Sequence, residues 1–161
     1  MLMPVRSREF RPEDALQVSE VDRLVTEDLR KVYRPTDLAV RQRDERTAAL
    51  ETVVAVLDDR VVGVVRYQIS GGQLAFLGLG VHPMARRRGV AQALVHYLEW
   101  IARDSGCSSM VAHTVRETGN VAVFERLGFL VESQESTGLI VSDRFPTLSE
   151  VRVRKSTMPR A

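Results

Sequence analysis

The sequence predicts a single domain of the α/β (α+β) class, built on a mixed, mostly antiparallel sheet of about seven strands flanked by helices. Strand-like runs follow one another across short turns between residues 52 and 81, which is typical of an antiparallel meander. The next strand-like run comes only after a long amphipathic segment, and such a crossover leaves its two flanking strands parallel. The 161 residues, taken as one domain over 1–161, are enough for a sizeable core.

The N-terminal third predicts one strand and two helices. A modest strand signal covers 5–10, and Pro12 then suits the first position of a helix. Apolar residues recur at spacings of three and four, which predicts a long amphipathic helix over 12–32. Pro35 ends it, because proline disfavours helical geometry at the preceding residue. Thr36 is expected to cap a second, weaker helix that runs to about Leu50.

The rest of the chain alternates strands with two helices. The β-branched and apolar runs predict strands over 52–57, 61–70, 73–81, 109–114, 130–137 and 150–154. Helical spacing predicts helices over 90–104 and 118–127. We expect residues from about 156 to 161 to form a flexible tail.

A basic loop joins the strand over 73–81 to the helix that begins at Val90. A helix N-terminus has unpaired amide donors and a partial positive charge, so it favours an anion. Gly89 and Ala91 are small and let a ligand approach the backbone, and three arginines add formal charge: Arg86, Arg87 and Arg88. This combination predicts a site for phosphate or pyrophosphate. A solvated arginine cluster that caps a turn is the alternative.

Composition excludes several classes of protein. Apolar residues make up 44% and charged residues 27%, which is ordinary for a globular protein, and no apolar run is long enough to span a membrane or to form a signal peptide. The single cysteine, Cys107, fits a reducing cytoplasm. A net charge of +2 gives no reason to expect nucleic acid or an anionic membrane as a partner. We expect no metal.

Three segments resemble motifs of the GNAT (GCN5-related N-acetyltransferase) superfamily. Arg86-x-x-Gly89-x-Ala91 resembles its acyl-CoA pyrophosphate loop, Q/R-x-x-G-x-G/A. Val81-His82-Pro83 resembles the Val-x-Pro at the end of its fourth strand. The segment over 120–129, NVAVFERLGF, is similar to its closing helix and Leu-Gly-Phe ending. Because the order of elements also fits, the resemblance covers nearly the whole chain.

The resemblance implies a sheet that splays between its fourth and fifth strands, with pantetheine in the gap. The backbone of Leu79 and Val81 would pair with pantetheine, and Asn120 and Phe124 would contact the far side of the cofactor. The pyrophosphate would be held by the amides of Arg86, Arg87, Arg88, Gly89, Val90 and Ala91. The implied reaction is acetyl transfer from acetyl-CoA to an amine by direct attack on the thioester, with the Val81 amide as oxyanion donor. Another acyl donor stays open.

The sequence departs from the family at the general acid. Many members carry a tyrosine where this chain has Phe124, and a phenyl ring cannot donate a proton. General acid catalysis contributes about 10²–10⁴-fold, so water or another group (Tyr33, Tyr67 or His113) would have to serve. The alternative is a non-catalytic GNAT-fold module that binds acyl-CoA as a sensor or regulator. An unrelated basic domain that binds phosphorylated ligands or nucleic acid would leave the Leu-Gly-Phe ending unexplained.

The general base and the acceptor are weakly specified by the sequence. Glu117 could act through water, although a solvated loop carboxylate is the alternative, and His113 faces either the gap or the core. Tyr33 is a candidate acceptor contact by analogy with the family. With no carboxylate on the fourth strand, an α-amino group (pKa about 7.7–8.0) is favoured over lysine (about 10.4), as a small molecule or a protein N-terminus. A homodimer is left open.

Overall fold

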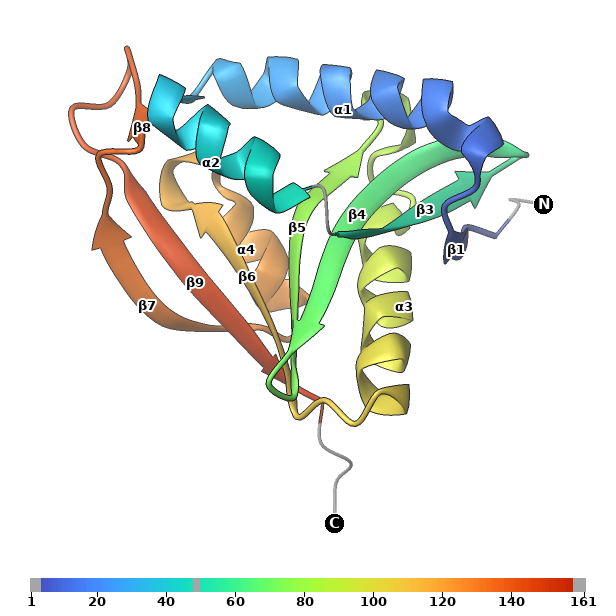
Figure 1. The fold of residues 1–161 in the computed structure, drawn as a ribbon. Coiled ribbons are helices and arrows are strands. Elements are labelled where there is room, and N and C mark those ends of the chain that lie inside the picture. The colour runs from blue at the N-terminus through green and yellow to red at the C-terminus, as the bar shows by residue number, and fades with distance from the viewer. Residues whose placement is uncertain (1–3, 48–49, 158–161) are drawn as a thin grey trace.

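The computed structural model describes residues 4–47 and 50–157 and contains a seven-stranded sheet with helices on both faces (Figure 1). The strand order is β1-β3-β4-β5-β6-β9-β7, and every neighbouring pair is antiparallel except β5 with β6. The strands are β1 Arg6–Glu9, β3 Glu51–Leu57, β4 Arg60–Ser70, β5 Gln73–Val81, β6 Ser109–Val115, β7 Leu130–Ser136 and β9 Ser149–Ser156. The predicted class and strand number are confirmed.

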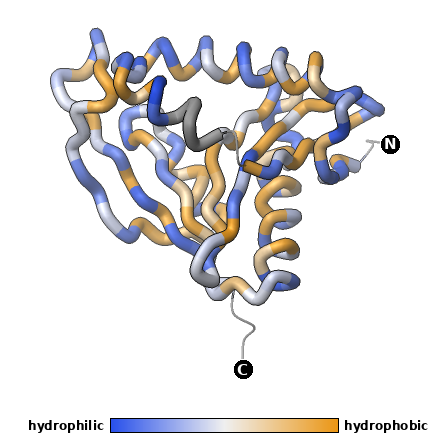
Figure 2. Tube along the Cα trace, viewed as in Figure 1, coloured by the Kyte–Doolittle hydropathy of each residue, from blue (hydrophilic) through white to orange (hydrophobic). Residues whose placement is uncertain are grey.

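Two helices cover each face of the sheet (Figure 1). They are α1 Ala15–Arg30 and α2 Asp37–Thr47 on one face, and α3 Val90–Asp104 and α4 Asn120–Arg126 on the other. The larger apolar core lies between the sheet and the α3/α4 layer, and a smaller cluster of five valines lies beneath α1. Figure 2 shows hydrophobic residues in the central strands and in α3, with hydrophilic residues along the outer turns of α1. The spacing of apolar residues therefore predicted the buried faces correctly.

The first helix begins three residues later than the sequence predicts. Residues Pro12–Asp14 form a 3₁₀ turn in which the buried Asp14 carboxylate accepts from the Arg11 backbone N–H at 2.8 Å. The same carboxylate takes two hydrogen bonds from the Arg8 guanidinium, at 2.7 and 2.9 Å. This pairing lowers the pKa of Asp14 and joins the start of the helix to β1.

The sheet splays between β5 and β6, as expected. These strands pair over only three residues, Gln73–Ala75 with Ser109–Val111, and then diverge (Figure 1). A bulge in β5 lies just beyond: Gly78 (φ 66°) and Leu79 together oppose one residue of β4. The edge of β5 that faces β6 therefore has no strand partner after residue 75 in the described part of the chain.

The sequence did not predict the small second sheet of the structure. β2 (Arg34–Pro35) pairs with β8 (Ile140–Val141), and the Ser142 hydroxyl donates to the Val32 carbonyl. Strands of two residues carry no periodic signal, so only the tertiary contact defines them. They tie the segment after α1 to the segment between β7 and β9.

Two further differences concern the ends of elements. The short helix over 118–127 is divided into a 3₁₀ turn, Arg116–Thr118, and α4. Ser156 and Thr157, which we expected in a flexible tail, belong to the fold: Ser156 is the last residue of β9, and the buried Thr157 donates to the Cys107 carbonyl at 2.7 Å. Residues 158–161 lie outside the described residues. No helix in the described part of the chain is long and apolar enough to cross a membrane.

Candidate active site

The basic loop leaves β5 through a fixed turn. His82 donates its backbone N–H to the Val62 carbonyl at 2.7 Å, and its Nδ1 accepts from the Met84 N–H at 3.1 Å. His82 is therefore a structural residue of the turn. Successive N–H groups of an extended strand point in opposite directions. Because His82 donates toward β4, the N–H of Val81 points away from β4, to the side from which β6 has diverged. Leu79 lies in the bulge of β5, where this alternation is interrupted.

The backbone of the loop is strained in a way that suits an anion. Arg87 has φ 65° and Gly89, the N-cap of α3, has φ 76°. A non-glycine residue in this region costs about 1–3 kcal/mol, so the surrounding structure must hold it there. Left-handed residues in a turn bring successive N–H groups to one concave side. Those groups lie beside the unpaired amides of the first turn of α3, so the loop can hold a phosphate.

The three arginines are not equivalent. Arg86 forms an ion pair with Asp28 at the end of α1, and Asp28 also accepts from Lys31 at 3.2 Å. Both partners, Arg86 first, lower the pKa of Asp28. Arg87 and Arg88 are exposed and have no ion-pair partner among the described residues. Only these two are free to meet an anion without breaking a contact.

A cavity of about 550 Å³ occupies the gap between the diverging strands. Leu77 and Leu79 of β5 line it on one side, and His113 and Thr114 of β6 line it on the other. The cavity extends beneath α1 and α2 and past β6 to β9. Its remaining polar lining residues are Tyr33, Gln42, Gln68, Gln73, Thr118, Asn120, Glu150 and Arg152. Val81 lies at the end of β5, half-buried and packed on the core, outside this lining.

Phe124 belongs to both the cavity and the core. It is 7% exposed, and its ring centroid lies 6.0 Å from that of Phe76 and 5.6 Å from that of Phe129. Asn120, one turn earlier on α4, also lines the cavity. Both α4 residues therefore line the gap, their contact with a cofactor stays a prediction, and the ring contacts give Phe124 a packing role that needs no hydroxyl.

Glu117 is held away from the cavity. One carboxylate oxygen accepts from the Ser149 N–H at 2.6 Å, which fastens the turn before α4 to the start of β9. The other oxygen is buried without a hydrogen-bond partner among the described residues. Glu117 does not line the cavity. A role as general base stays a prediction, and the geometry favours a structural one.

The structure settles the orientation of His113, which the sequence left open: its exposed side chain lines the cavity. Tyr33, which follows α1, also lines the cavity, and its contact with an acceptor stays a prediction. Tyr67 packs on the core instead, where burial raises the pKa of its hydroxyl. Glu150 and Arg152 of β9 were not singled out from the sequence. Their alternation with two buried valines was the available signal.

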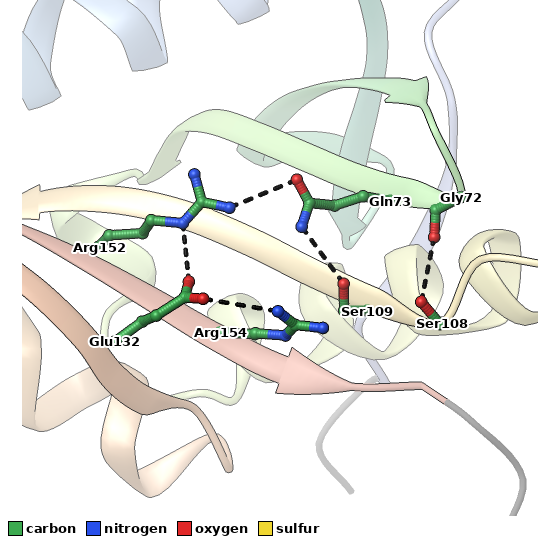
Figure 3. A network of polar contacts seen from close by, with 7 residues as sticks. All are labelled: Gly72, Gln73, Ser108, Ser109, Glu132, Arg152 and Arg154. Atoms are coloured by element: carbon green, nitrogen blue, oxygen red, sulfur yellow. Dashed lines mark hydrogen bonds and ion pairs between the residues drawn. The ribbon is translucent and has the colours of Figure 1, made fainter.

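A polar network closes the narrow end of the cavity, where β5 and β6 still pair (Figure 3). Glu132 accepts from Arg152 Nε at 2.7 Å and from Arg154 Nη1 at 3.5 Å, and these charges lower its pKa. Gln73 accepts from Arg152 Nη2 at 3.5 Å and donates to the Ser109 hydroxyl at 3.4 Å. The network links β5, β6, β7 and β9, and it partly compensates the charge of Arg152.

A family model matches most of this arrangement. The model of the Acetyltransferase (GNAT) family matches residues 18–129, which include the splayed strands, the basic loop and α4. The chain belongs to the GNAT acetyltransferase family. Membership indicates acyl-CoA-dependent N-acetyl transfer. Among the described residues of this GNAT protein, no group of three or more His, Cys, Asp or Glu side chains is placed to hold a metal ion.

Solved structures share the fold over the full length. The ribosomal-protein-S18-alanine N-acetyltransferase from Escherichia coli has a TM-score of 0.75 at 10% identity, covering 98% of this chain and 96% of its own. PaiA N-acetyltransferase from Thermoplasma acidophilum, in complex with coenzyme A, has 0.72 at 15%, covering 96% and 99%. An aminoglycoside 6'-N-acetyltransferase complexed with coenzyme A has 0.71 at 16%, covering 96% and 98%.

Proposed function

We propose that this GNAT protein transfers the acetyl group of acetyl-CoA to an amine by direct attack of the amine on the thioester carbon. The observation that carries the proposal is the cavity between β5 and β6, which is lined by β5 up to Leu79, two residues before the strand ends and leads into the basic loop, and which reaches beneath α1 and α2. Cofactor and acceptor can therefore approach from different sides and meet in the gap.

The cofactor occupies the loop and the gap. The backbone amides of Arg86, Arg87, Arg88, Gly89, Val90 and Ala91 hold the pyrophosphate. Pantetheine runs along the unpaired edge of β5, where the N–H groups of Leu79 and Val81 are available as donors. Asn120 and Phe124 of α4 contact the cofactor from the other side. The presence of coenzyme A in two structures of similar fold supports this placement.

The transfer needs a neutral amine, a donor for the developing oxyanion and a leaving thiolate. The amine nitrogen forms a bond to the carbonyl carbon while the C–S bond breaks, and the Val81 amide donates to the oxyanion. A thiol has an ordinary pKa near 8.5, so the thiolate can leave without an acid and take its proton from water. Phe124 is compatible with this course.

We assign the proton acceptor to His113. Its side chain projects into the cavity from β6, on the side of the gap opposite the β5 edge, and no other imidazole lines the cavity in the described part of the chain. The imidazole takes the proton that the attacking nitrogen loses. His113→Gln should lower kcat at least 10²-fold with little change in acetyl-CoA affinity, since general bases contribute about 10²–10⁴-fold.

Binding and turnover are tested separately. Acetyl-CoA should raise the melting temperature of the wild type but not of Gly89→Glu, which places a carboxylate at the phosphate site. Gly106→Glu is the matched control, because Gly106 has the same left-handed backbone as Gly89 (φ 74° and 76°) and a Cβ added there meets nothing within 4 Å. Release of free CoA is then followed with a panel of amines. A cofactor-dependent shift without CoA release for any amine would identify a sensor instead; an equal shift in Gly89→Glu would reject the loop assignment.

For the biological setting, we propose a cytoplasmic enzyme that binds no metal, nucleic acid or membrane. Its acceptor is an amine of low pKa on a small molecule or a protein N-terminus, and Tyr33 contacts it at the α1 end of the cavity. The names of two enzymes of similar fold include a small-molecule acceptor, an aminoglycoside, and a protein acceptor, ribosomal protein S18. A homodimer is testable by light scattering.

A further inference from the structure

The charges around the cavity are unevenly compensated. Its ionisable lining residues in the described part of the chain are Tyr33, His113, Glu150 and Arg152. Arg152 already donates to Glu132 at 2.7 Å. No hydrogen bond or ion pair joins the side chain of Glu150 to a described residue. It is the lining carboxylate that forms no ion pair within the described protein.

The neighbours of Glu150 explain why its charge stays unbalanced. It is half-buried on β9, where its cross-strand partners are Val115 of β6 and Glu135 of β7. A like charge directly opposite is unfavourable and cannot neutralise it. Arg152 lies two residues along the same face, about 7 Å away at the usual rise of a strand. A cation brought by a ligand would meet an unpaired acceptor here.

We propose that Glu150 binds a second ammonium group of the acceptor, so that the substrates are amines carrying at least two cationic groups. The inference rests on the proposed acetyl transfer. One amine reacts in the gap while the other pairs with Glu150 on β9, across β6 from the gap.

The test compares two acceptors of the same shape, 1,4-diaminobutane and 1-aminopentane, in which a methyl group replaces the second ammonium. Wild type should favour the diamine, and the preference should weaken with salt. In Glu150→Gln, KM for the diamine should rise about tenfold, or 1.4 kcal/mol, while kcat and the monoamine KM change less than about twofold. The exposed Glu20→Gln, outside the cavity lining, is the charge-matched control and should change neither.

Each outcome decides the proposal. Equal use of both amines by wild type, or an unchanged preference in Glu150→Gln, overturns the role of Glu150 but leaves acetyl transfer standing. So does a preference for carboxylate-bearing amines that disappears in Arg152→Gln. Absence of CoA release with any amine rejects the proposed function itself. If Glu150→Gln does not fold, the salt-sensitive preference of wild type for the diamine still supports or refutes the inference.

Discussion

Adding one methyl group at Gly63 should weaken cofactor binding from a position that the cofactor never touches. A Cβ at this residue of β4 would lie 2.6 Å from Cγ1 of Val90, 3.1 Å from Leu94 and 3.3 Å from Ala55. Val90 is the first residue of α3 and is 2% exposed, so its stiff branched side chain has no room to turn aside. The first turn of α3, which carries the proposed phosphate donors, must move instead.

The magnitude follows from the packing. Overfilled cores cost about 1–3 kcal/mol, and 1 kcal/mol lowers Tm by about 2–4 °C in a protein of this size, so Gly63→Ala should melt about 2–12 °C lower. Losing the geometry of one hydrogen bond to a charged group costs about 1.5–3 kcal/mol. We therefore expect acetyl-CoA affinity, measured by calorimetry at a temperature where the variant is folded, to fall about ten- to hundredfold.

One control adds a methyl group at a glycine without close neighbours, and a second variant removes the atom that the new methyl group meets. Gly138→Ala adds a methyl group where nothing lies within 4 Å and should change neither Tm nor affinity by a measurable amount. Val90→Ala removes the clashing Cγ1. In a double-mutant cycle, Gly63→Ala should cost at least about 1 kcal/mol less in the Val90→Ala background than in wild type. Equal costs in the two backgrounds, or an unchanged affinity in Gly63→Ala, would refute the reasoning.

Three further predictions concern single side chains. Asp28→Asn should tighten acetyl-CoA binding a few-fold and steepen its salt dependence, because it frees Arg86; weaker binding by calorimetry would show that the pair positions Arg86 instead. Phe124→Tyr should leave kcat unchanged or slightly raised in steady-state assays, and a gain above about 10²-fold would contradict protonation of the thiolate by water. Asp14→Asn should lose about 2–3 kcal/mol of unfolding free energy at pH 7. Because folding lowers the pKa of Asp14, its contribution is full above the ordinary value near 3.9 and is lost as pH falls through the folded value, so denaturant melts at pH 7 and 3 should show the difference shrinking.

The local sequence pattern was sufficient to predict the bounds of an element wherever that element buries one continuous face. The predicted bounds of β5 and α3 agree with the structure to the residue, because a strand stopped by Pro83 and a helix begun after Gly89 are both marked by backbone chemistry. The first helix was placed less well, because Asp14 draws the preceding turn into a contact with β1. That contact is tertiary and has no trace in the helical spacing.

The candidate site likewise has parts that the local sequence predicts and parts that only the fold brings together. The anion loop could be predicted, since its charges and small residues are adjacent in the sequence. The Asp28 partner of Arg86 could not, because it is 58 residues away in the chain. From the sequence, Glu117 is either a base acting through water or a solvated loop carboxylate, because its Ser149 N–H partner is 32 residues away in the chain. The far side of the cavity likewise depends on β9 being inserted between β6 and β7, an order that the sequence does not reveal.

β5 and β6 are joined over only three residue pairs, so a small rotation at the joined end produces a larger displacement at the far end of β5. Beyond Ala75, β5 continues for six residues to Val81, a length of about 20 Å at the usual rise of a strand. A rotation of about 3° at the joined end would therefore displace Val81 by about 1 Å, which is enough to spoil an oxyanion contact. The hydrogen bonds between Gln73 and both Ser109 and Arg152 lie at that joined end (Figure 3). The width of the opening is thus open to adjustment by residues far from the transferred group.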